Sequence, residues 1–377
     1  MYKVSVIIPM YNREHIIGRA LDSVLAQTLE DIEIIVVDDG SQDGSVDVVK
    51  SYQRKYDNIK LFVAQHGGPG PARNLGIAHA MGKYIAFLDS DDFVPENAYQ
   101  TMYGLAEEKA CDVVIGQLLR KIDTVQNGEW YSPTNIANVI RSHVGENCAG
   151  SFDIMLENPS MWNRFINREF WIKNRLGYNN QIFGEDFVCN YHLFRAAKSM
   201  YTVDEVVYCY ETSYSDASST ISTIKPSVVI SGLASAKDIA LEFDAMGRAD
   251  WEIQFLTGYF SFALDRFWML DEADRSEPFE RVKEILQLYQ GRQEYEIPIE
   301  DLMGLGLDTL LLLPYKGFEI CRNIMRKRCI VTSTAPLKEA NPDYKNKVLQ
   351  MYRDGEIGFR YIVKYFVAWL KYKVQKK

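Results

Sequence analysis

The chain has 377 residues, of which 47% are hydrophobic and 25% charged, and its formal net charge is −9. These proportions are those of a globular protein and exclude a disordered, collagen-like or repeat-built chain. The charge is uneven, because residues 1–313 hold 27 Lys and Arg against 46 Asp and Glu, whereas residues 314–377 hold 15 against 5. We therefore expect no nucleic-acid partner for the acidic body, while the basic end could meet an anionic membrane surface.

The six cysteines show neither a CxxC pair nor a metal-ligand spacing. This pattern is typical of buried, reduced thiols in a reducing compartment. The sequence begins directly with a strand-like run, MYKVSVIIP, which leaves no room for a signal peptide. We therefore expect a cytoplasmic protein.

The first third of the chain alternates between strand-like and helix-like segments. Apolar runs predict strands at residues 4–8, 32–37, 59–63 and 84–88, and helical spacing predicts helices around residues 16–25, 48–56 and 72–78. Shorter strands are predicted at 113–116 and 201–210, with a helix at 185–196. This alternation favours a parallel sheet with helices on its faces.

A polar break, YSDASST at residues 214–220, separates this part from a helical remainder. Helical spacing recurs at about 225–245, 250–271, 277–290, 298–312, 316–329, 343–352 and 356–374. We therefore expect two domains, residues 1–220 and residues 221–377, with the second all-α.

Acidic residues follow two of the predicted strands. Asp38 and Asp39 end the second, and Asp89, Asp91 and Asp92 follow the fourth. Ligands of open α/β sheets bind at the edge formed by the carboxyl ends of the strands. Three carboxylates in four residues repel one another unless a cation or hydrogen-bond donors offset their charge, and oxygen ligands suit Mg²⁺ or Mn²⁺. The alternative is a solvated acidic turn that caps the next helix.

Five segments in this order resemble the motifs of glycosyltransferase family 2, inverting enzymes with a GT-A type fold. They are SVIIPMYN (5–12), EIIVVDDGSQDGS (33–45), GPARNLGI (70–77), YIAFLDSDD (84–92) and FGEDF (183–187). The resemblance covers roughly residues 1–215 and implies an α/β fold, a GT-A type nucleotide-diphospho-sugar transferase sheet with helices on both faces. It also implies an enzyme of bacterial cell-surface polysaccharide synthesis. The C-terminal region, expected to be all-α from its helical spacing, lies outside the resemblance.

The resemblance further implies a nucleotide-sugar donor, most often a UDP-sugar, at the edge of the sheet. In it Tyr11 would pack near the base, Asp39 would accept a hydrogen bond from the base, and Arg73 would lie near the nucleotide. The donor-binding residues implied in this way are Pro9, Tyr11, Asn12, Asp38, Asp39, Arg73, Asp89 and Ser90. The alternatives are that Tyr11 and Asn12 are turn residues, that Arg73 forms a surface ion pair, and that Asp38 anchors its loop.

The family pattern assigns the metal contact chiefly to Asp91, with Asp89 beside it, and the metal would be Mn²⁺ or Mg²⁺. It assigns the catalytic base to Asp186, with Glu185 as the neighbouring candidate. A carboxylate suits this task because a one-step displacement needs the acceptor hydroxyl to be deprotonated as it attacks. The alternative is that both acids complement the dipole of the helix that they begin.

Two segments depart from the family pattern. In MWNRFINREFW (161–171), Arg164 stands where relatives usually have Lys, so it could support the acceptor pocket or the diphosphate, or belong with Trp162 and Phe165 to the core. The loop before Arg73, GGPGP, lacks the Asn or Lys common in relatives, which leaves donor phosphate contacts there open.

The basic end carries an amphipathic pattern at residues 356–374. It is too short in apolar residues to span a bilayer, which takes about 20, but could lie on an anionic surface. Alternatively, this helix packs within its domain or forms an oligomer contact. The acceptor implied by family habit and by this end is a glycan or lipid-linked glycan, which would place the enzyme peripherally on the inner face of the plasma membrane.

Two other functions remain open on sequence alone. A sugar nucleotidyltransferase also uses a doubly wound sheet and a metal. Its chemistry, however, requires a Gly-rich loop followed by a basic residue after the first strand, and this chain has PMYNRE there. A catalytically inactive scaffold would bind nucleotide sugar or glycan without transfer, and the retained Asp39, Asp91 and Asp186 argue against it.

Overall fold

The computed structural model describes residues 1–122, 128–181, 183–212, 225–246, 266–267, 270–274 and 276–287. The chain divides into two compact units, each held together mainly by contacts within itself. The first comprises residues 1–242 and 258–270, and the second comprises residues 243–257 and 271–377. Among the described residues, no helix has both the length and the apolar character that crossing a bilayer requires.

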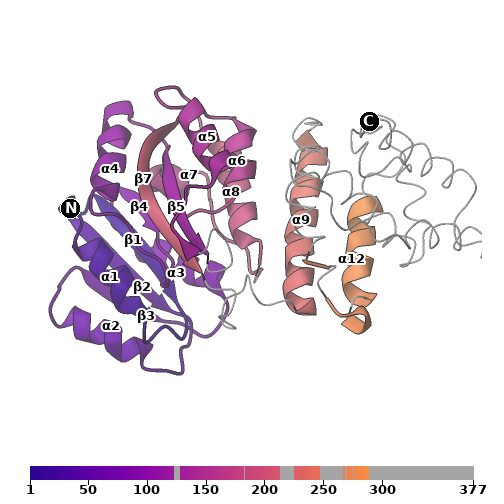
Figure 1. The fold of residues 1–377 in the computed structure, drawn as a ribbon, viewed down its shortest axis with the longest axis horizontal. Helices are drawn as coiled ribbons and strands as arrows, with labels where there is room; N and C mark the ends of the chain where they lie inside the picture. The colour runs from indigo at the N-terminus through magenta and orange to yellow at the C-terminus, as the bar shows by residue number, and fades with distance from the viewer. Residues whose placement is uncertain are drawn as a thin grey trace, which may run out of the picture. The chain divides into compact units, whose positions relative to one another are not determined.

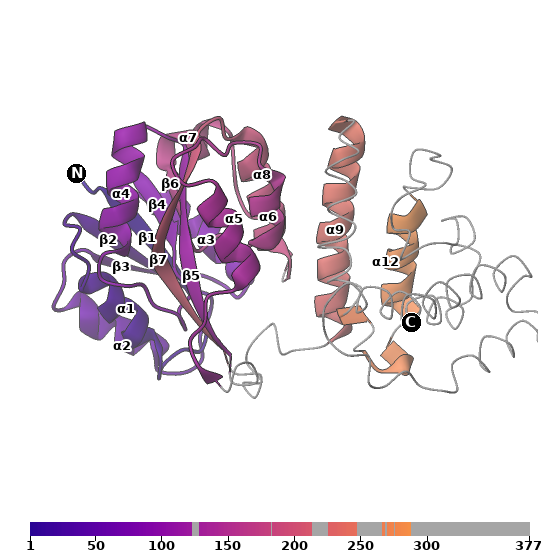
Figure 2. The same ribbon diagram turned by 45° about the horizontal axis from the view of Figure 1, so that its top comes forward.

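One sheet forms the centre of the first unit. In chain order its strands in the described residues are β1 (Val4–Met10), β2 (Ile32–Asp38), β3 (Ile59–Val63), β4 (Tyr84–Phe87), β5 (Val113–Ile122), β6 (Arg164–Asn167) and β7 (Met200–Thr212). In space their order is β3-β2-β1-β4-β6-β5-β7. The first four strands are parallel, β6 is antiparallel to both β4 and β5, and β5 pairs in parallel with β7. The two long strands run side by side in both views (Figures 1 and 2).

Helices cover both faces of this sheet. Those described in the first unit are α1 (Ile17–Leu25), α2 (Ser45–Gln53), α3 (Pro69–His79), α4 (Ala98–Lys109), α5 (Thr134–Ser142), α6 (Phe152–Glu157), α7 (Arg168–Lys173), α8 (Glu185–Ala196) and most of α9 (Pro226–Met246). Helices α1, α2 and α4 lie on one face, with α3 and α7 on the other (Figure 1). Strand β4 shows why: the Tyr84 ring meets Tyr103 of α4, whereas the Phe87 ring meets Trp171 of α7.

Strands β1 and β2 are buried along their whole length, as expected for parallel strands covered on both faces. Pro9 is tolerated within β1 because the β1–β4 ladder ends at the Ile7–Phe87 pair, where Ile7 accepts the backbone N–H of Leu88. The backbone polar groups of successive residues in a strand point to alternate sides, so the nitrogen of Pro9, like that of Ile7, points toward β4. It lies beyond the last residue pair of the two strands. The missing N–H of Pro9 therefore costs no ladder hydrogen bond.

The α/β fold with helices on both faces is confirmed. Strand β6 was not predicted: it has four residues and includes Arg164 and Asn167. In the second unit, the described part holds a 3-10 turn (Glu272–Asp274) and α12 (Ser276–Gln287). The segments expected to be helical at 298–312, 316–329, 343–352 and 356–374 lie outside the described residues. The expected boundary near residue 220 also falls in a segment left undescribed, 213–224, and stays a prediction.

Helix α3 packs against the sheet through a glycine, and this contact gives a stability prediction. A Cβ on Gly76 would stand 2.5 Å from Cγ2 of Ile7, whereas a Cβ on Gly104 in α4 would meet no atom within 4 Å among the described residues. We expect Gly76→Ala to lower the free energy of unfolding by about 1–3 kcal/mol through overpacking. Gly104→Ala, the matched control, should raise it by about 0.5–1 kcal/mol because alanine favours the helix. Denaturant titration measures both, and equal stability of the two variants would contradict the tight packing.

Candidate active site

The loops that follow β1 and β2 are joined by hydrogen bonds at the carboxyl edge of the sheet. The backbone N–H of Asn12 donates to Oγ of Ser41 (2.9 Å), and the Asn12 side-chain oxygen accepts from the N–H of Gln42 (2.8 Å). Asn12 has a φ of +52°, a left-handed conformation that Asn adopts more readily than most residues. Asn12 thus makes the turn that the sequence suggested and ties the two loops together.

Asp38 and Asp39 are both buried and both accept backbone hydrogen bonds. Asp38 accepts the N–H of Ser41 at 3.1 Å, so it anchors its own loop. Asp39 accepts the N–H groups of Gly67 (2.7 Å) and Gly68 (2.9 Å), one on each carboxylate oxygen. Each oxygen has a second lone pair, so Asp39 keeps acceptor capacity for a ligand.

A histidine that the sequence did not suggest lies beside Asp39. Nδ1 of His66 is 2.9 Å from Oδ2 of Asp39, and the His66 ring stacks on the Tyr11 ring with centroids 4.3 Å apart. The Tyr11 residue is 39% exposed and the His66 side chain 60% exposed. Two partly exposed rings therefore lie next to Asp39, the carboxylate predicted to accept a hydrogen bond from the nucleotide base.

The acidic loop after β4 is held from strand β7. Oη of Tyr208 donates to Oδ2 of Asp92 (2.7 Å) and accepts the backbone N–H of Asp89 (3.1 Å), while the N–H of Glu211 donates to Oδ1 of Asp92 (3.0 Å). Burial, together with the charges of Asp91 and Asp89, raises the pKa of Asp92 well above its ordinary value. Asp92 and Tyr208 are thus internal supports of the loop, and Ser90 is buried within it.

Asp91 faces cationic side chains. Its Oδ2 is 3.4 Å from Nη2 of Arg13, and Arg19 donates to its backbone carbonyl. Burial raises the pKa of Asp91 above its ordinary value, and the negative charge of Asp89 adds to this effect. A cation bound here would favour the ionised carboxylate.

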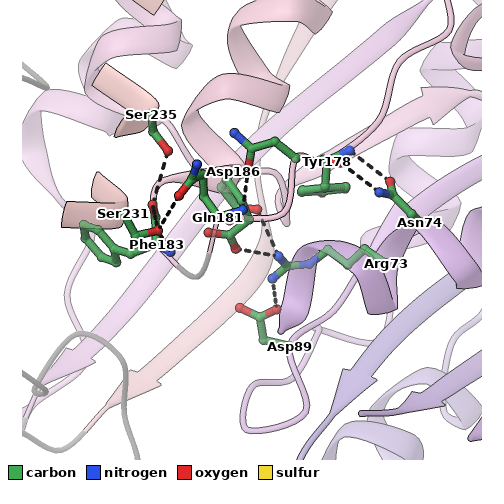
Figure 3. A network of polar contacts seen from close by, with 11 residues as sticks. Arg73, Asn74, Asp89, Tyr178, Gln181, Phe183, Asp186, Ser231 and Ser235 are labelled. Carbon is green, nitrogen blue, oxygen red and sulfur yellow. Dashed lines mark hydrogen bonds and ion pairs between the residues drawn. The ribbon is translucent and has the colours of Figure 1, made fainter. Parts of the chain in front are cut away.

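Arg73 brings the acidic loop together with the acids of α8. Nη2 of Arg73 donates to Oδ1 of Asp89 at 2.7 Å, and Nη1 donates both to Oε1 of Glu185 at 3.0 Å and to Oδ1 of Asp186 at 3.1 Å (Figure 3). The Arg73 side chain is only 5% exposed. Acids from the loop after β4 and from α8, which are far apart in the sequence, therefore share one buried guanidinium. This burial excludes the alternative that Arg73 forms a surface ion pair.

The electrostatics of this cluster follow from burial and proximity. Burial disfavours the charged guanidinium, but Asp186 and Asp89 more than offset it and raise the pKa of Arg73. For Asp186, burial raises the pKa to about 7, because it outweighs the opposing effect of Arg73 and is assisted by Glu185 and Asp89. A carboxylate with a pKa near neutrality suits a general base.

Local backbone features position the partners of Arg73. Gly184 caps α8 with a φ of +84°, so Glu185 and Asp186 fall in the first turn of that helix. Asn74 holds the backbone of Tyr178 at both ends, donating to its carbonyl (2.8 Å) and accepting its N–H (2.9 Å). The ring of Tyr178 lies 5.2 Å from the Arg73 guanidinium. Asn74 and Tyr178 were not singled out from the sequence.

Arg164 belongs to the interior. It is fully buried and donates to the Asn158 carbonyl (2.6 Å) and to Oδ1 of Asn163 (2.7 Å). Burial lowers the pKa of Arg164 to about 9. Trp162 is 8% exposed and stacks on Tyr208. These contacts favour the core interpretation of this segment over an acceptor pocket.

The acidic loop, residues 89–92, offers oxygen ligands for a divalent cation. Within the described ranges, no three acidic, His or Cys side chains are grouped so as to enclose a metal ion. Mg²⁺, however, usually takes only one or two protein carboxylates and completes its shell with water and substrate phosphates. Asp91 and Asp89 meet that requirement, and a cation beside them would offset the repulsion between their negative charges. The residues therefore fit a metal that shares its ligands with a diphosphate.

Comparisons with known proteins place this site in context. The family profile described as Glycosyl transferase family 2 matches residues 5–171. The chain is 42% identical over 120 residues to the poly(ribitol-phosphate) beta-glucosyltransferase of Bacillus spizizenii, covering 31% of this chain and 19% of that protein. It is 32% identical over 210 residues to the uncharacterized glycosyltransferase EpsJ of Bacillus subtilis, covering 55% of this chain and 60% of that protein. The chain thus spans less than two thirds of either relative.

Among solved structures, the chain resembles S. aureus TarS 1-349 in complex with UDP-GlcNAc. The TM-score is 0.65 at 20% identity, and the alignment covers 94% of this chain and 92% of that one. At this level of identity the likeness shows a shared fold.

The support of the acidic loop by Tyr208 can be tested by removing one hydroxyl. We expect Tyr208→Phe to lower the free energy of unfolding by about 1–3 kcal/mol, because Asp92 and the N–H of Asp89 both lose a buried partner. Tyr99→Phe is the matched control, since the Tyr99 hydroxyl is buried and has no hydrogen-bond partner in the described part of the chain. Urea denaturation of both variants is the measurement. A Tyr208 variant as stable as its Tyr99 counterpart would show that β7 does not support the loop.

Proposed function

Since residues 5–171 belong to glycosyltransferase family 2, we propose that this protein is an inverting glycosyltransferase. In this proposal it moves a sugar from a nucleotide-sugar donor, a UDP-sugar, to a hydroxyl of a glycan or lipid-linked glycan. The observation that carries the proposal is the Arg73 cluster, because it joins the acidic loop of Asp89 to Asp186 through one side chain. The UDP-GlcNAc bound to TarS and the glucosyltransferase relative support the donor class.

The proposed donor site follows the carboxyl edge of β1, β2 and β4. Tyr11 and His66 offer a stacked pair of rings for the base, next to Asp39 with its remaining acceptor capacity. Asp38 and Asn12 shape the loops around it, as do Pro9 at the end of β1 and Ser90 in the acidic loop. Asp91 and Asp89 would hold Mn²⁺ or Mg²⁺. When bound, such an ion neutralises the charge that develops on the departing diphosphate.

Asp186 is the proposed base. The acceptor oxygen forms a bond to the anomeric carbon as the bond from that carbon to the diphosphate oxygen breaks. The bonding electrons leave with UDP, and the acceptor proton passes to the Asp186 carboxylate. Arg73 orients this carboxylate through its 3.1 Å hydrogen bond, and Glu185 holds the same nitrogen of Arg73 at 3.0 Å. With a pKa of about 7, Asp186 is partly ionised at neutral pH, and the ionised form is the one that accepts the proton.

The proposed acceptor and the proposed location of the enzyme are inferred in part from the charge of its C-terminal end. Residues 314–377 are basic, which suits the anionic inner face of a plasma membrane and a lipid-linked acceptor. The amphipathic segment at 356–374 is outside the described residues. Peripheral membrane binding, a cytoplasmic location and an oligomeric state therefore stay predictions.

Removal of the base tests the proposed reaction. We expect Asp186→Asn to lower kcat by about 10²- to 10⁴-fold, since a positioned general base contributes this much. UDP release in the presence of Mn²⁺ and a panel of UDP-sugars is the measurement, and thermal shift with the donor should show retained binding.

Asp47→Asn is the control for this experiment. Asp47 is also a first-turn acid, in α2, and its side chain is 88% exposed. If both variants were as active as the wild type, Asp186 would be no more than a first-turn acid complementing its helix, and Glu185 would be the next base to test.

The pH dependence of turnover follows from the same carboxyl group. Because Asp186 must be ionised to accept a proton and its pKa is about 7, kcat should rise with pH through this value and level off above it. Below the pKa the rate should fall about tenfold per pH unit, as the ionised fraction does. Steady-state rates between pH 5.5 and 9 test this. A profile that is flat across neutrality, or that falls as pH rises, would contradict the base assignment.

A further inference from the structure

Helix α9 contacts the segment that leads into Asp186, although it lies beyond residues 5–171, which the family profile matches. Ser231 and Ser235 of this helix are both buried, with exposed fractions of 5% and 0%. Because they are four residues apart, their hydroxyls project from the same face of the helix. The face that they share is turned toward Phe183, two residues before Glu185.

The two hydroxyls hold both backbone polar groups of Phe183. The N–H of Phe183 donates to Oγ of Ser231 (3.1 Å), and Oγ of Ser235 donates to the Phe183 carbonyl (3.3 Å) (Figure 3). Oγ of Ser231 also donates to Oε1 of Gln181 (3.0 Å). Oγ of Ser231 is also 3.3 Å from the Phe183 carbonyl, so Ser231 meets both backbone polar groups of Phe183 and Ser235 meets one. The two peptide groups that flank Phe183 are thus held from outside their own loop.

A second contact joins α9 to the far end of α8. Glu242 lies three helical turns after Ser231, on the same face of α9. Its Oε2 accepts from Nη1 of Arg195 (2.9 Å), and its Oε1 is 2.7 Å from Nε2 of His192. Helix α8 is therefore held by α9 near its C-terminal end and through the segment that precedes its first turn.

We propose that Ser231 and Ser235 are positioning residues for Asp186. They hold the two peptide groups that flank Phe183, ahead of α8, and so fix the direction in which its first turn presents the carboxylate to Arg73 and to the acceptor. This inference rests on the proposed function. It makes α9 part of the catalytic unit, although the family profile ends well before it. Displacement of a catalytic group by about 1 Å is enough to cost on the order of 10²-fold in rate.

The test uses the full chain with Ser231→Ala and Ser235→Ala combined. Ser227→Ala is the matched control, because Ser227 is an exposed serine on the same helix. We expect kcat for UDP release with a UDP-sugar and Mn²⁺ to fall about 10- to 100-fold, while the donor KM changes less than about twofold, because the donor loops are untouched. Two single variants complete the test. Ser231→Thr, which keeps the hydroxyl, should retain most of the kcat that Ser231→Ala loses.

Rates are compared at a temperature at which thermal melting shows every variant to be folded. If the double variant then has the wild-type kcat, the serines act on stability alone and the proposal is wrong. Equal loss of rate in Ser227→Ala would also overturn it.

Amide hydrogen exchange separates this inference from the proposed function. In the double variant, the amides of residues 183–187 should exchange faster than in Ser227→Ala, whether or not any donor is turned over. If the wild type releases no UDP from any nucleotide sugar, the proposed function fails, and the exchange result still reports on the serines. Unchanged exchange at residues 183–187 would overturn their positioning role.

Discussion

One buried guanidinium organises this site. Arg73 is surrounded by the carboxylates of Asp89, Glu185 and Asp186, and the surrounding charges keep it protonated despite its burial. A buried cation of this kind is tolerated only with such partners, and loss of one member of a buried ion pair typically costs about 3–5 kcal/mol. The same interaction that stabilises the interior therefore brings the loop after β4 to the first turn of α8.

The sequence around Arg73 is adapted to this contact. Gly68 caps the N-terminus of α3 with a φ of +94°, and Gly70 allows close approach of the neighbouring loop, because a Cβ there would stand 2.7 Å from the Asn179 carbonyl. Asn74 then clasps the backbone of Tyr178, and Gly76 lets α3 lie against Ile7 of the central strand. The segment GGPGPARNLG thus combines the backbone donors for Asp39, the close packing of α3 on the sheet and the position of Arg73.

The sheet was more accessible to sequence reasoning than the site was. Strands β1 to β4 follow from apolar runs because parallel strands are buried on both faces, whereas β6 is short, antiparallel and includes Arg164, so no run identifies it. Motif order predicted Asp89, Arg73 and Asp186 as site residues. It could not show that Arg73 joins the acids. Nor could it show that Tyr208 of β7 donates a hydrogen bond to Asp92, because nothing in the sequence distinguishes this tyrosine from other aromatic residues of the core.

In the proposed reaction, Asp89, Asp91 and Asp186 flank one bound sugar. A crystal structure of the full chain with Mn²⁺ and a non-hydrolysable UDP-sugar analogue tests this most directly. It should show the anomeric carbon between the acidic loop and α8, with the Asp186 carboxylate on the side of the ring opposite the diphosphate. A sugar ring bound away from Asp186, or with Asp186 on the same side as the diphosphate, would contradict the account.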